Sequence, residues 1–290
     1  MAIPGNNSAW NNEFYANFVT DAEFAAYETS VSRQLCKLFQ VPMNAGKVAQ
    51  VPIWGQGTAQ LITDEDAATA RNTTSTQALI TLDEHVYFSQ VSDMLRESAY
   101  GDVMSQLAEI SGRAIGESLD TLAFSKFSGF SSDIGTTSTE LTTEIILKAA
   151  ATLRGRKVMG PYFAVVHPNQ AYYMKKTLTQ TLPYNGASGL VNPSDVGNQV
   201  MVSGVIGSIG GVTIIESPLV AAGATTGGVT TYVAGVFAPT ALGIAERGGL
   251  NLQTLYLPQN RATDMSVVAV AGASVLQALH GVAITADGTI

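Results

Sequence analysis

The sequence predicts an α+β fold. Apolar residues recur at helical spacing in several stretches before residue 180, whereas β-type runs separated by turn residues dominate after residue 200. Of the 290 residues, 46% are hydrophobic and 13% are charged, so the chain has the apolar content for a substantial core. This composition excludes a disordered chain, which combines low hydrophobicity with high charge.

A polar, Asn-rich arm over residues 1–20 precedes the first predicted helix. Apolar side chains then recur every three or four residues and share one helical face: Phe24, Tyr27, Val31, Leu35 and Leu38. Thr20 or Asp21 is suited to cap this helix, and Pro42 follows its end. The spacing therefore predicts one helix between Asp21 and Pro42.

Residues 46–90 predict an extended β-hairpin. A strand over 47–54 contains Pro52, which is tolerated at a sheet edge, and a returning strand covers roughly 76–90. The acidic triplet Asp64, Glu65 and Asp66 falls at or near the tip. The arms hold few apolar residues and an isolated hairpin is marginal in water, so we expect this hairpin to pack on a neighbouring subunit.

A short helix over 92–98 precedes a long helix that Asp102 caps and that runs to about Phe127. Gly112 and Gly116 lie four residues apart on one stripe of this long helix. An interior glycine costs about 1 kcal/mol relative to alanine, so a reason for both is expected. We predict that the closing β-sheet crosses the helix closely at these two glycines.

Further elements alternate along the remaining chain. A helix over 143–154 ends in the cationic cluster Arg154, Arg156 and Lys157, as suits the negative end of a helix dipole. A strand over 162–166 and a helix over 170–177 follow, and 181–200 is rich in turn residues. Strands are then predicted over 200–206, 212–216, 229–237, 242–247, 250–257 and 264–275.

No catalytic or metal-binding pattern is found in the sequence. The three histidines, His85, His167 and His280, lack the spacing of a zinc site, and Cys36 is the single cysteine. The glycine run from Gly204 to Gly211 is followed by strand signals, so a phosphate site would lack its helix N-terminus. We therefore predict no enzyme activity, no cofactor and no metal, although a catalytic group assembled in space remains open.

The net charge and the distribution of charged residues along the chain limit the kinds of partner that the protein can bind. The formal net charge is −8, which disfavours nucleic-acid binding as the main function. Charged residues number 31 in residues 1–176 but 7 in residues 177–290, and large uncharged surfaces favour subunit contacts. The uncharged stretches 217–245 and 265–286 contain Gly, Pro and polar residues, so they indicate buried strands rather than membrane spans. The N-terminus does not show a signal-peptide pattern.

The order of these elements resembles the major capsid protein of tailed bacteriophages. This is the Hong Kong 97-like fold, which encapsulin shells share. Three segments carry the resemblance: 87–98 between the hairpin and the long helix, 204–218, and the closing strands over 250–282. It spans nearly the whole chain and depends on element order rather than on one motif.

The resemblance implies four regions: an N-terminal arm over 1–45, an extended loop over 46–91, a peripheral domain over 92–158 with 249–290, and an axial domain over 159–248. It implies a structural subunit that self-assembles into hexameric and pentameric capsomers of an icosahedral shell around double-stranded DNA, without binding that DNA specifically. Further implied partners are a separate scaffolding protein, a portal and a decoration protein, with no membrane. The expected location is the virion, assembled in the cytoplasm of a bacterial host.

Two alternatives stay open at this stage: an encapsulin-like shell around a cargo enzyme, and a soluble α+β enzyme. Because the hairpin of the resembled family reaches an adjacent subunit, we also expect Asp64, Glu65 and Asp66 to pair with Arg154, Arg156 and Lys157 of a neighbour. The competing interpretation is that both clusters are solvated.

Overall fold

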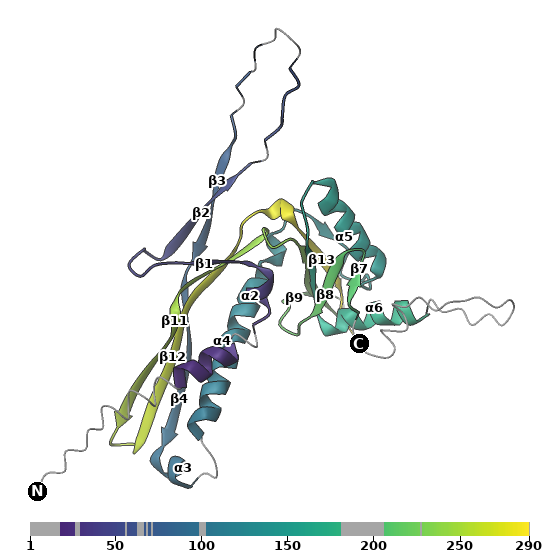
Figure 1. Cartoon of the computed structure of the whole chain (residues 1–290). Helices are drawn as coiled ribbons and strands as arrows, with labels where there is room; N and C mark the ends of the chain where they lie inside the picture. The colour runs from purple at the N-terminus through teal and green to yellow at the C-terminus, as the bar shows by residue number, and fades with distance from the viewer. Residues whose placement is uncertain are drawn as a thin grey trace, which may run out of the picture.

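The computed structural model describes residues 18–26, 30–55, 57–62, 67, 69–70, 72–98, 103–180, 206–226 and 228–289. A projecting hairpin, a long sheet with a helix along it, and a second sheet covered by helices make up the molecule (Figure 1). Among the described helices, none combines the length and apolarity needed to cross a membrane.

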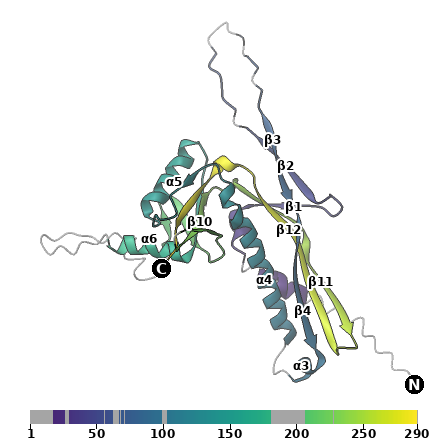
Figure 2. The same cartoon turned by 180° about the vertical axis from the view of Figure 1, so that it is seen from behind.

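The long sheet has the strand order β1-β11-β12-β4. These strands are β1 (Lys37–Gln40), β11 (Leu242–Leu257), β12 (Ala262–Val275) and β4 (Asp83–Ser92). β11 and β12 form an antiparallel ribbon of roughly 45–50 Å, with an irregularity in register between Arg247 and Asn251. The helix α4 (Val103–Ser125) runs along one face of this sheet (Figure 2). Met265 and Val267 of β12 pack there against Ile115 and Leu119 of α4.

The second sheet has the order β5-β13-β10-β6-β8-β7, with β9 on β10. Its strands are β5 (Asp133–Ile134), β6 (Tyr162–Val166), β7 (Ser208–Ile209), β8 (Val212–Glu216), β9 (Ala222–Thr226), β10 (Val229–Phe237) and β13 (Gly281–Asp287). The helices α5 (Thr143–Gly155) and α6 (Pro168–Gln180) share a hydrophobic core with it. An aromatic cluster of Phe124, Phe127, Phe130 and Phe237, with ring centres 5.4–6.2 Å apart, fills the junction between the two sheets.

The hairpin pairs β2 (Val48–Trp54) with β3 (Ser75–Thr81) and extends away from the body (Figure 1). The expected returning strand is therefore two strands, because Leu82 separates β3 from β4 and only β4 joins the long sheet. The helix α3 (Asp93–Ser98) follows β4 at the far end of that sheet. Short 3-10 helices cover Lys126–Gly129 and Ala278–His280.

The prediction of one helix between Asp21 and Pro42 is wrong. Residues 18–26 are helical, but α2 (Ser32–Leu35) is a separate single turn, and Leu38 belongs to strand β1. A carboxylate from α4, that of Asp120, accepts hydrogen bonds from the backbone N–H groups of Val31 and Ser32 and so starts a new helical turn there. Parallel pairing with β11 then holds Lys37–Gln40 extended.

The other predicted elements lie within a few residues of the observed ones. The strands 162–166, 212–216 and 229–237 are confirmed with the same bounds, and the long helix begins and ends within two residues of its prediction. The two strands predicted over 242–247 and 250–257 are one strand, β11, interrupted by the register shift. The predicted turn region 181–200 lies outside the described residues, as does most of the strand predicted over 200–206.

Candidate assembly interface

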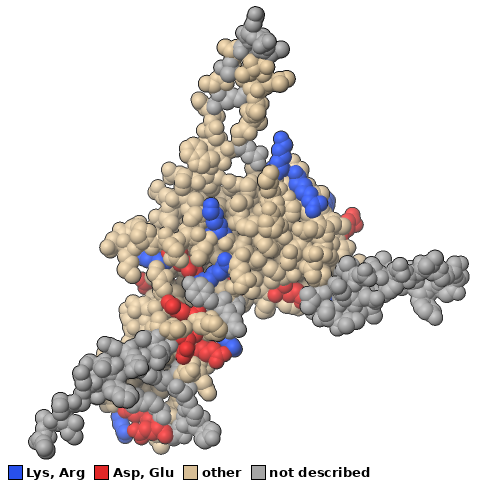
Figure 3. All heavy atoms as spheres, viewed as in Figure 1, with Lys and Arg blue, Asp and Glu red and all other residues tan. Residues whose placement is uncertain are grey.

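The predicted cationic cluster lies at the end of α5, where Arg156 faces the hairpin near Trp54 and Thr76. Lys and Arg atoms gather over this part of the molecule in Figure 3. Arg154 donates from Nη2 to the carbonyl oxygen of Gly210 at 2.5 Å, and its guanidinium lies 5.9 Å from the ring centre of Tyr162. Arg154 thus links α5 by a hydrogen bond to the turn that joins β7 to β8.

Arg156 is held by its own chain as well. Its Nη1 donates to Ser131 Oγ at 3.1 Å and to the Leu279 carbonyl oxygen at 3.0 Å, and its Nη2 donates to Ser132 Oγ. The side chain of Lys157, in contrast, is exposed and has no hydrogen-bond or ion-pair partner among the described residues. Of the three cations, Lys157 is the one whose charge is available to another molecule without loss of an internal contact.

The acidic half of the expected pairing, Asp64, Glu65 and Asp66, lies outside the described residues. The described residues just before it, Leu61 and Ile62, expose 99% and 45% of their surface. Whether the acidic triplet meets the cations of a neighbour therefore stays a prediction.

The hairpin exposes apolar side chains over much of its length. Trp54 is 67% exposed and Leu79 is 55% exposed, whereas Ile80, near the foot, is fully buried. Large apolar side chains are stabilised when they leave water, by about 25 cal/mol per Å² of surface. The nearer half of the hairpin, with Ile80 and Val51, thus packs on the body of its own chain, and the farther half presents uncovered apolar surface.

A hollow of about 530 Å³ opens between the hairpin and the turn that follows β12. One wall is formed by Ile53, Trp54, Gly55, Thr74 and Thr76 of the hairpin, and the other by Leu276–His280. Arg156 also lines it and holds the carbonyl of Leu279. The site therefore combines apolar walls with one cation.

Gly112 is a site of close approach, but its partner is not the predicted one. A Cβ atom there would lie 2.2 Å from the backbone oxygen of Ala22, so the helical segment 18–26 crosses α4 at this glycine. The prediction that the closing β-sheet crosses at Gly112 is wrong, because β12 packs on α4 through Ile115 and Leu119 instead. Gly116 is buried, as a close-packed position requires.

The sequence did not predict the hydrogen bonds that hold residues 30–32 against α4. Asp120 accepts hydrogen bonds from Ser30 Oγ at 2.8 Å and Ser32 Oγ at 2.5 Å, in addition to the two backbone N–H groups. The one available signal was a carboxylate that occupies the apolar face of α4 directly after Leu119. A buried carboxylate requires such donors, because an unpaired buried charge is very costly.

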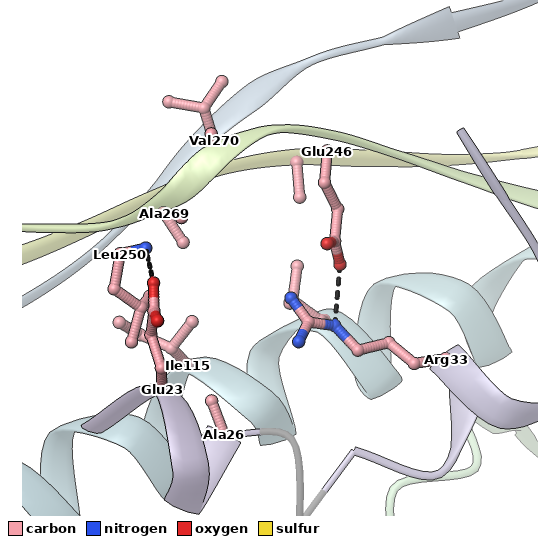
Figure 4. Close-up of a pocket in the computed structure, with 12 residues that line it drawn as sticks. Glu23, Ala26, Arg33, Ile115, Glu246, Leu250, Ala269 and Val270 are labelled. Atoms are coloured by element: carbon pink, nitrogen blue, oxygen red, sulfur yellow. Dashed lines mark hydrogen bonds and ion pairs between the residues drawn. The ribbon is translucent and has the colours of Figure 1, made fainter. Parts of the chain in front are cut away.

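Two further contacts fix the same segment to β11 (Figure 4). Arg33 Nε lies 2.7 Å from Glu246 Oε1 in a mostly buried ion pair, and Glu23 Oε1 accepts a hydrogen bond of 3.1 Å from Leu250 N. The small cavity of about 20 Å³ between them is too small for a substrate. This region is therefore a structural joint between α4, the N-terminal segment and β11.

The titratable groups that could support catalysis are dispersed. His85 Nδ1 lies 2.7 Å from Ser118 Oγ, His167 stacks on Tyr232 with ring centres 3.7 Å apart, and His280 Nδ1 lies 2.7 Å from Thr240 Oγ1. Burial lowers the pKa of all three histidines. Burial, with a smaller contribution from the charge of Asp120, raises the pKa of the Cys36 thiol to about 12, so this thiol is not an active nucleophile. The described residues contain no group of three side chains suited to a metal ion.

Comparison with known proteins agrees with the fold described above. A family model described as phage capsid protein matches residues 75–284, which is most of the chain. No curated protein sequence matches. The chain belongs to the phage capsid protein family.

Solved structures with the same fold include phage shells. The chain is similar to the capsid of cyanophage P-SCSP1u, with 16% identity, a TM-score of 0.66, and coverage of 90% of this chain and 89% of that one. It is similar to the capsid of Ralstonia phage GP4, with 13% identity, a TM-score of 0.67, and 87% of each chain covered. A virus-like particle from Pyrococcus furiosus has 12% identity and a TM-score of 0.59, with 93% of this chain and 98% of that one covered.

The α+β, Hong Kong 97-like prediction is confirmed by these matches. The family makes the protein a structural protein of a phage capsid, and the fold is the one expected for the major capsid protein of a tailed phage.

Proposed function

We propose that copies of this chain associate into hexameric and pentameric capsomers of an icosahedral shell, with each hairpin packed on a neighbouring copy. The observation that carries this proposal is the apolar surface that the hairpin exposes beyond the half packed on its own chain, where Trp54 and Leu61 are 67% and 99% exposed. Two strands without such cover are marginal in water. A neighbour supplies the missing surface at every hairpin of a closed shell.

The four regions inferred from the resemblance are kept in the proposal, with one change. The arm is 1–45 and the loop 46–91, and β1 and β4 within them join the long sheet. The helix α4 and strand β12 belong to the peripheral domain, and β6, β8 and β10 belong to the axial domain. We move 143–155 and 281–287 to the axial domain. The reason is that α5 shares the core of the second sheet and that β13 pairs with β10.

The interior of the proposed shell encloses double-stranded DNA without specific binding, and the chain has no enzyme activity and needs no cofactor. The net charge of −8 supports a lining that does not hold DNA tightly. A separate scaffolding protein, a portal and a decoration protein are the proposed further partners, with assembly in the cytoplasm of a bacterial host.

A second candidate is an encapsulin-like shell around a cargo enzyme. The similarity to the virus-like particle from Pyrococcus furiosus, of which 98% is covered, favours it. The two candidates share one fold, so the contents of the particle distinguish them. Nuclease-resistant DNA supports the phage shell, and a co-purifying protein cargo without DNA supports the alternative.

Negative-stain electron microscopy of the purified chain tests the shared part of both proposals. We expect closed shells tens of nanometres across under assembly conditions. A monodisperse small oligomer under all assembly conditions, with or without a co-expressed scaffolding protein, would contradict both.

A further inference from the structure

The hollow beside the hairpin and the exposed end of the hairpin are two features that no other described part of the chain covers. In the part of the chain that the structure describes, no large hydrophobic side chain is more exposed than Leu61, at 99%. The hollow is open on the side of Trp54 and Leu279, which are themselves 67% and 60% exposed. Both features expose apolar surface to water, which is unfavourable in a free subunit.

The two features match in chemistry. Leu61 and Ile62 are aliphatic and would fill a space walled by Ile53, Trp54 and Leu279. The sequence after Ile62 contains three successive acidic residues, whereas Arg156 lines the hollow and Lys157 follows it at the end of α5. An apolar contact beside opposite charges is the usual composition of a specific protein interface.

The hairpin end does not fill the hollow of its own chain in this structure. Leu61 follows Trp54 by seven residues, which can span at most roughly 25 Å, and the hairpin points away from the body (Figure 1). Leu61 is also absent from the walls of the hollow. The described residues of the chain thus leave the hollow unfilled, and a second copy in the proposed shell can supply the occupant.

We infer that Leu61 and Ile62 of one copy insert into the hollow beside Trp54 and Leu279 of a second copy. The inserted surface and the accepting surface are different parts of one chain, so the contact is heterologous and leaves one free end and one free hollow on each pair. Repetition of the contact closes a ring when the rotation permits. Because the hollow lies between the hairpin and the body, its filling also fixes the angle of the hairpin.

This inference depends on the proposed assembly and names its contact. The test is disulfide crosslinking of assembled particles with Leu61→Cys and Leu279→Cys in one chain. Reaction between different copies is expected to produce a ladder of covalent oligomers beyond dimers on a non-reducing gel. The natural Cys36 is buried and does not compete.

The matched control is Leu61→Cys with Leu255→Cys, because Leu255 is 62% exposed but lies on β11, away from the hollow. This control and the two single variants are expected to stop at dimers, since a chain with one reactive contact cannot propagate. Normal particles in which the Leu61 and Leu279 pair also stops at dimers would overturn the inference while leaving the assembly proposal intact. An equal ladder from the Leu255 control would overturn it too.

Trp54 fluorescence provides a second measurement that does not require cysteines. In a Trp10→Phe background, burial of Trp54 on assembly is expected to shift its emission to shorter wavelength, and Leu61→Ser is expected to weaken both the shift and assembly. Absence of particles from the unmodified chain contradicts the assembly proposal instead. Particles of Leu61→Ser with normal yield and an undiminished Trp54 shift contradict the insertion.

Discussion

Asp120 shows how one buried carboxylate determines the path of a whole segment. Its two oxygens accept four hydrogen bonds from residues 30–32, so the N-terminal chain turns at this point instead of continuing as a helix. Its charge is buried near Cys36, where it contributes to the raised pKa of the thiol. The carboxylate is stabilised by two backbone N–H groups and two serine hydroxyl groups.

We predict that Asp120→Ala lowers the free energy of unfolding of the isolated subunit by about 2–4 kcal/mol, because it leaves several buried donors without a partner. Asp120→Asn keeps an acceptor and should cost less. Urea denaturation of both variants measures the difference. Glu117→Ala, an exposed position one turn away, is the control and should have a small effect. Equal, small losses in all three variants would show that the segment 30–32 does not depend on the carboxylate.

Gly112 is a second residue that fixes the N-terminal segment, because it lets the backbone of Ala22 approach α4 closely. The Cβ atom of Gly112→Ala would lie 2.2 Å from the Ala22 oxygen, so the segment 18–26 must move away from α4. Overpacking of this kind costs about 1–3 kcal/mol, and we expect a corresponding fall in the thermal midpoint. Gly155→Ala in α5 is the control, since its added Cβ meets nothing within 4 Å. A midpoint for Gly112→Ala as high as that of the control would contradict the close crossing.

Among the elements, the hairpin is unusual because the described residues of its own chain cover only its nearer half, around Ile80 and Val51. We predict that the backbone amides of β2 and β3 exchange rapidly in free subunits and become protected in assembled particles. Amides of β12, which lies between β11 and β4 in the long sheet, should be protected in both states. Hydrogen exchange followed by mass spectrometry measures this contrast. Hairpin amides that stay unprotected in particles would contradict packing on a neighbour.

Local pattern predicted the elements that have their own periodicity or flanking turn residues. The long helix α4, α5 and the strands of the second sheet were found because apolar spacing and glycine turns define them in sequence. The segment between Asp21 and Pro42 was misassigned because its helical spacing competes with a carboxylate 90 positions further on and with an edge of β11. Long-range partners of this kind leave no local signal.

For the candidate interface, the sequence predicted some of the residues but not their contacts. Runs of charge and helix glycines are visible in sequence, so Arg154, Arg156, Lys157 and Gly112 were found. Their roles were not, since the internal bonds of Arg154 and Arg156 and the partner of Gly112 depend on chain segments distant in sequence. The hollow was missed entirely, because its two walls come from residues 53–76 and 276–280.

At the scale of the whole molecule, charge is concentrated in the first 176 residues, where 31 of the 38 charged side chains lie. Figure 3 shows a group of cations over α5, and acidic atoms mixed with further cations toward the other end of the molecule. The cations over α5 give each copy a positive surface that acidic groups of a neighbouring copy can meet. Each exposed pair contributes about 0–1 kcal/mol, but the contact repeats in every copy of a shell and sets register as well as affinity.

Charge reversal tests the predicted pairing of Asp64, Glu65 and Asp66 with the cations at the end of α5. Replacing the triplet with lysines is expected to block or slow assembly, since like charges would then face each other. Reversal of Arg154 or Arg156 would also break hydrogen bonds to Gly210 or Leu279. Lys157→Glu breaks no such bond, so we combine it with the lysine triplet and expect it to restore assembly in part.

Light scattering at low salt and at 1 M salt measures the rate of assembly. Because the screening length falls to about 3 Å at 1 M, the assembly defect of the triple-lysine variant should be smaller there. Lys148→Glu, on the exposed side of α5, is the control for a general change of net charge and should restore less. Normal assembly of the triple-lysine variant at low salt would show that both clusters are solvated in the shell.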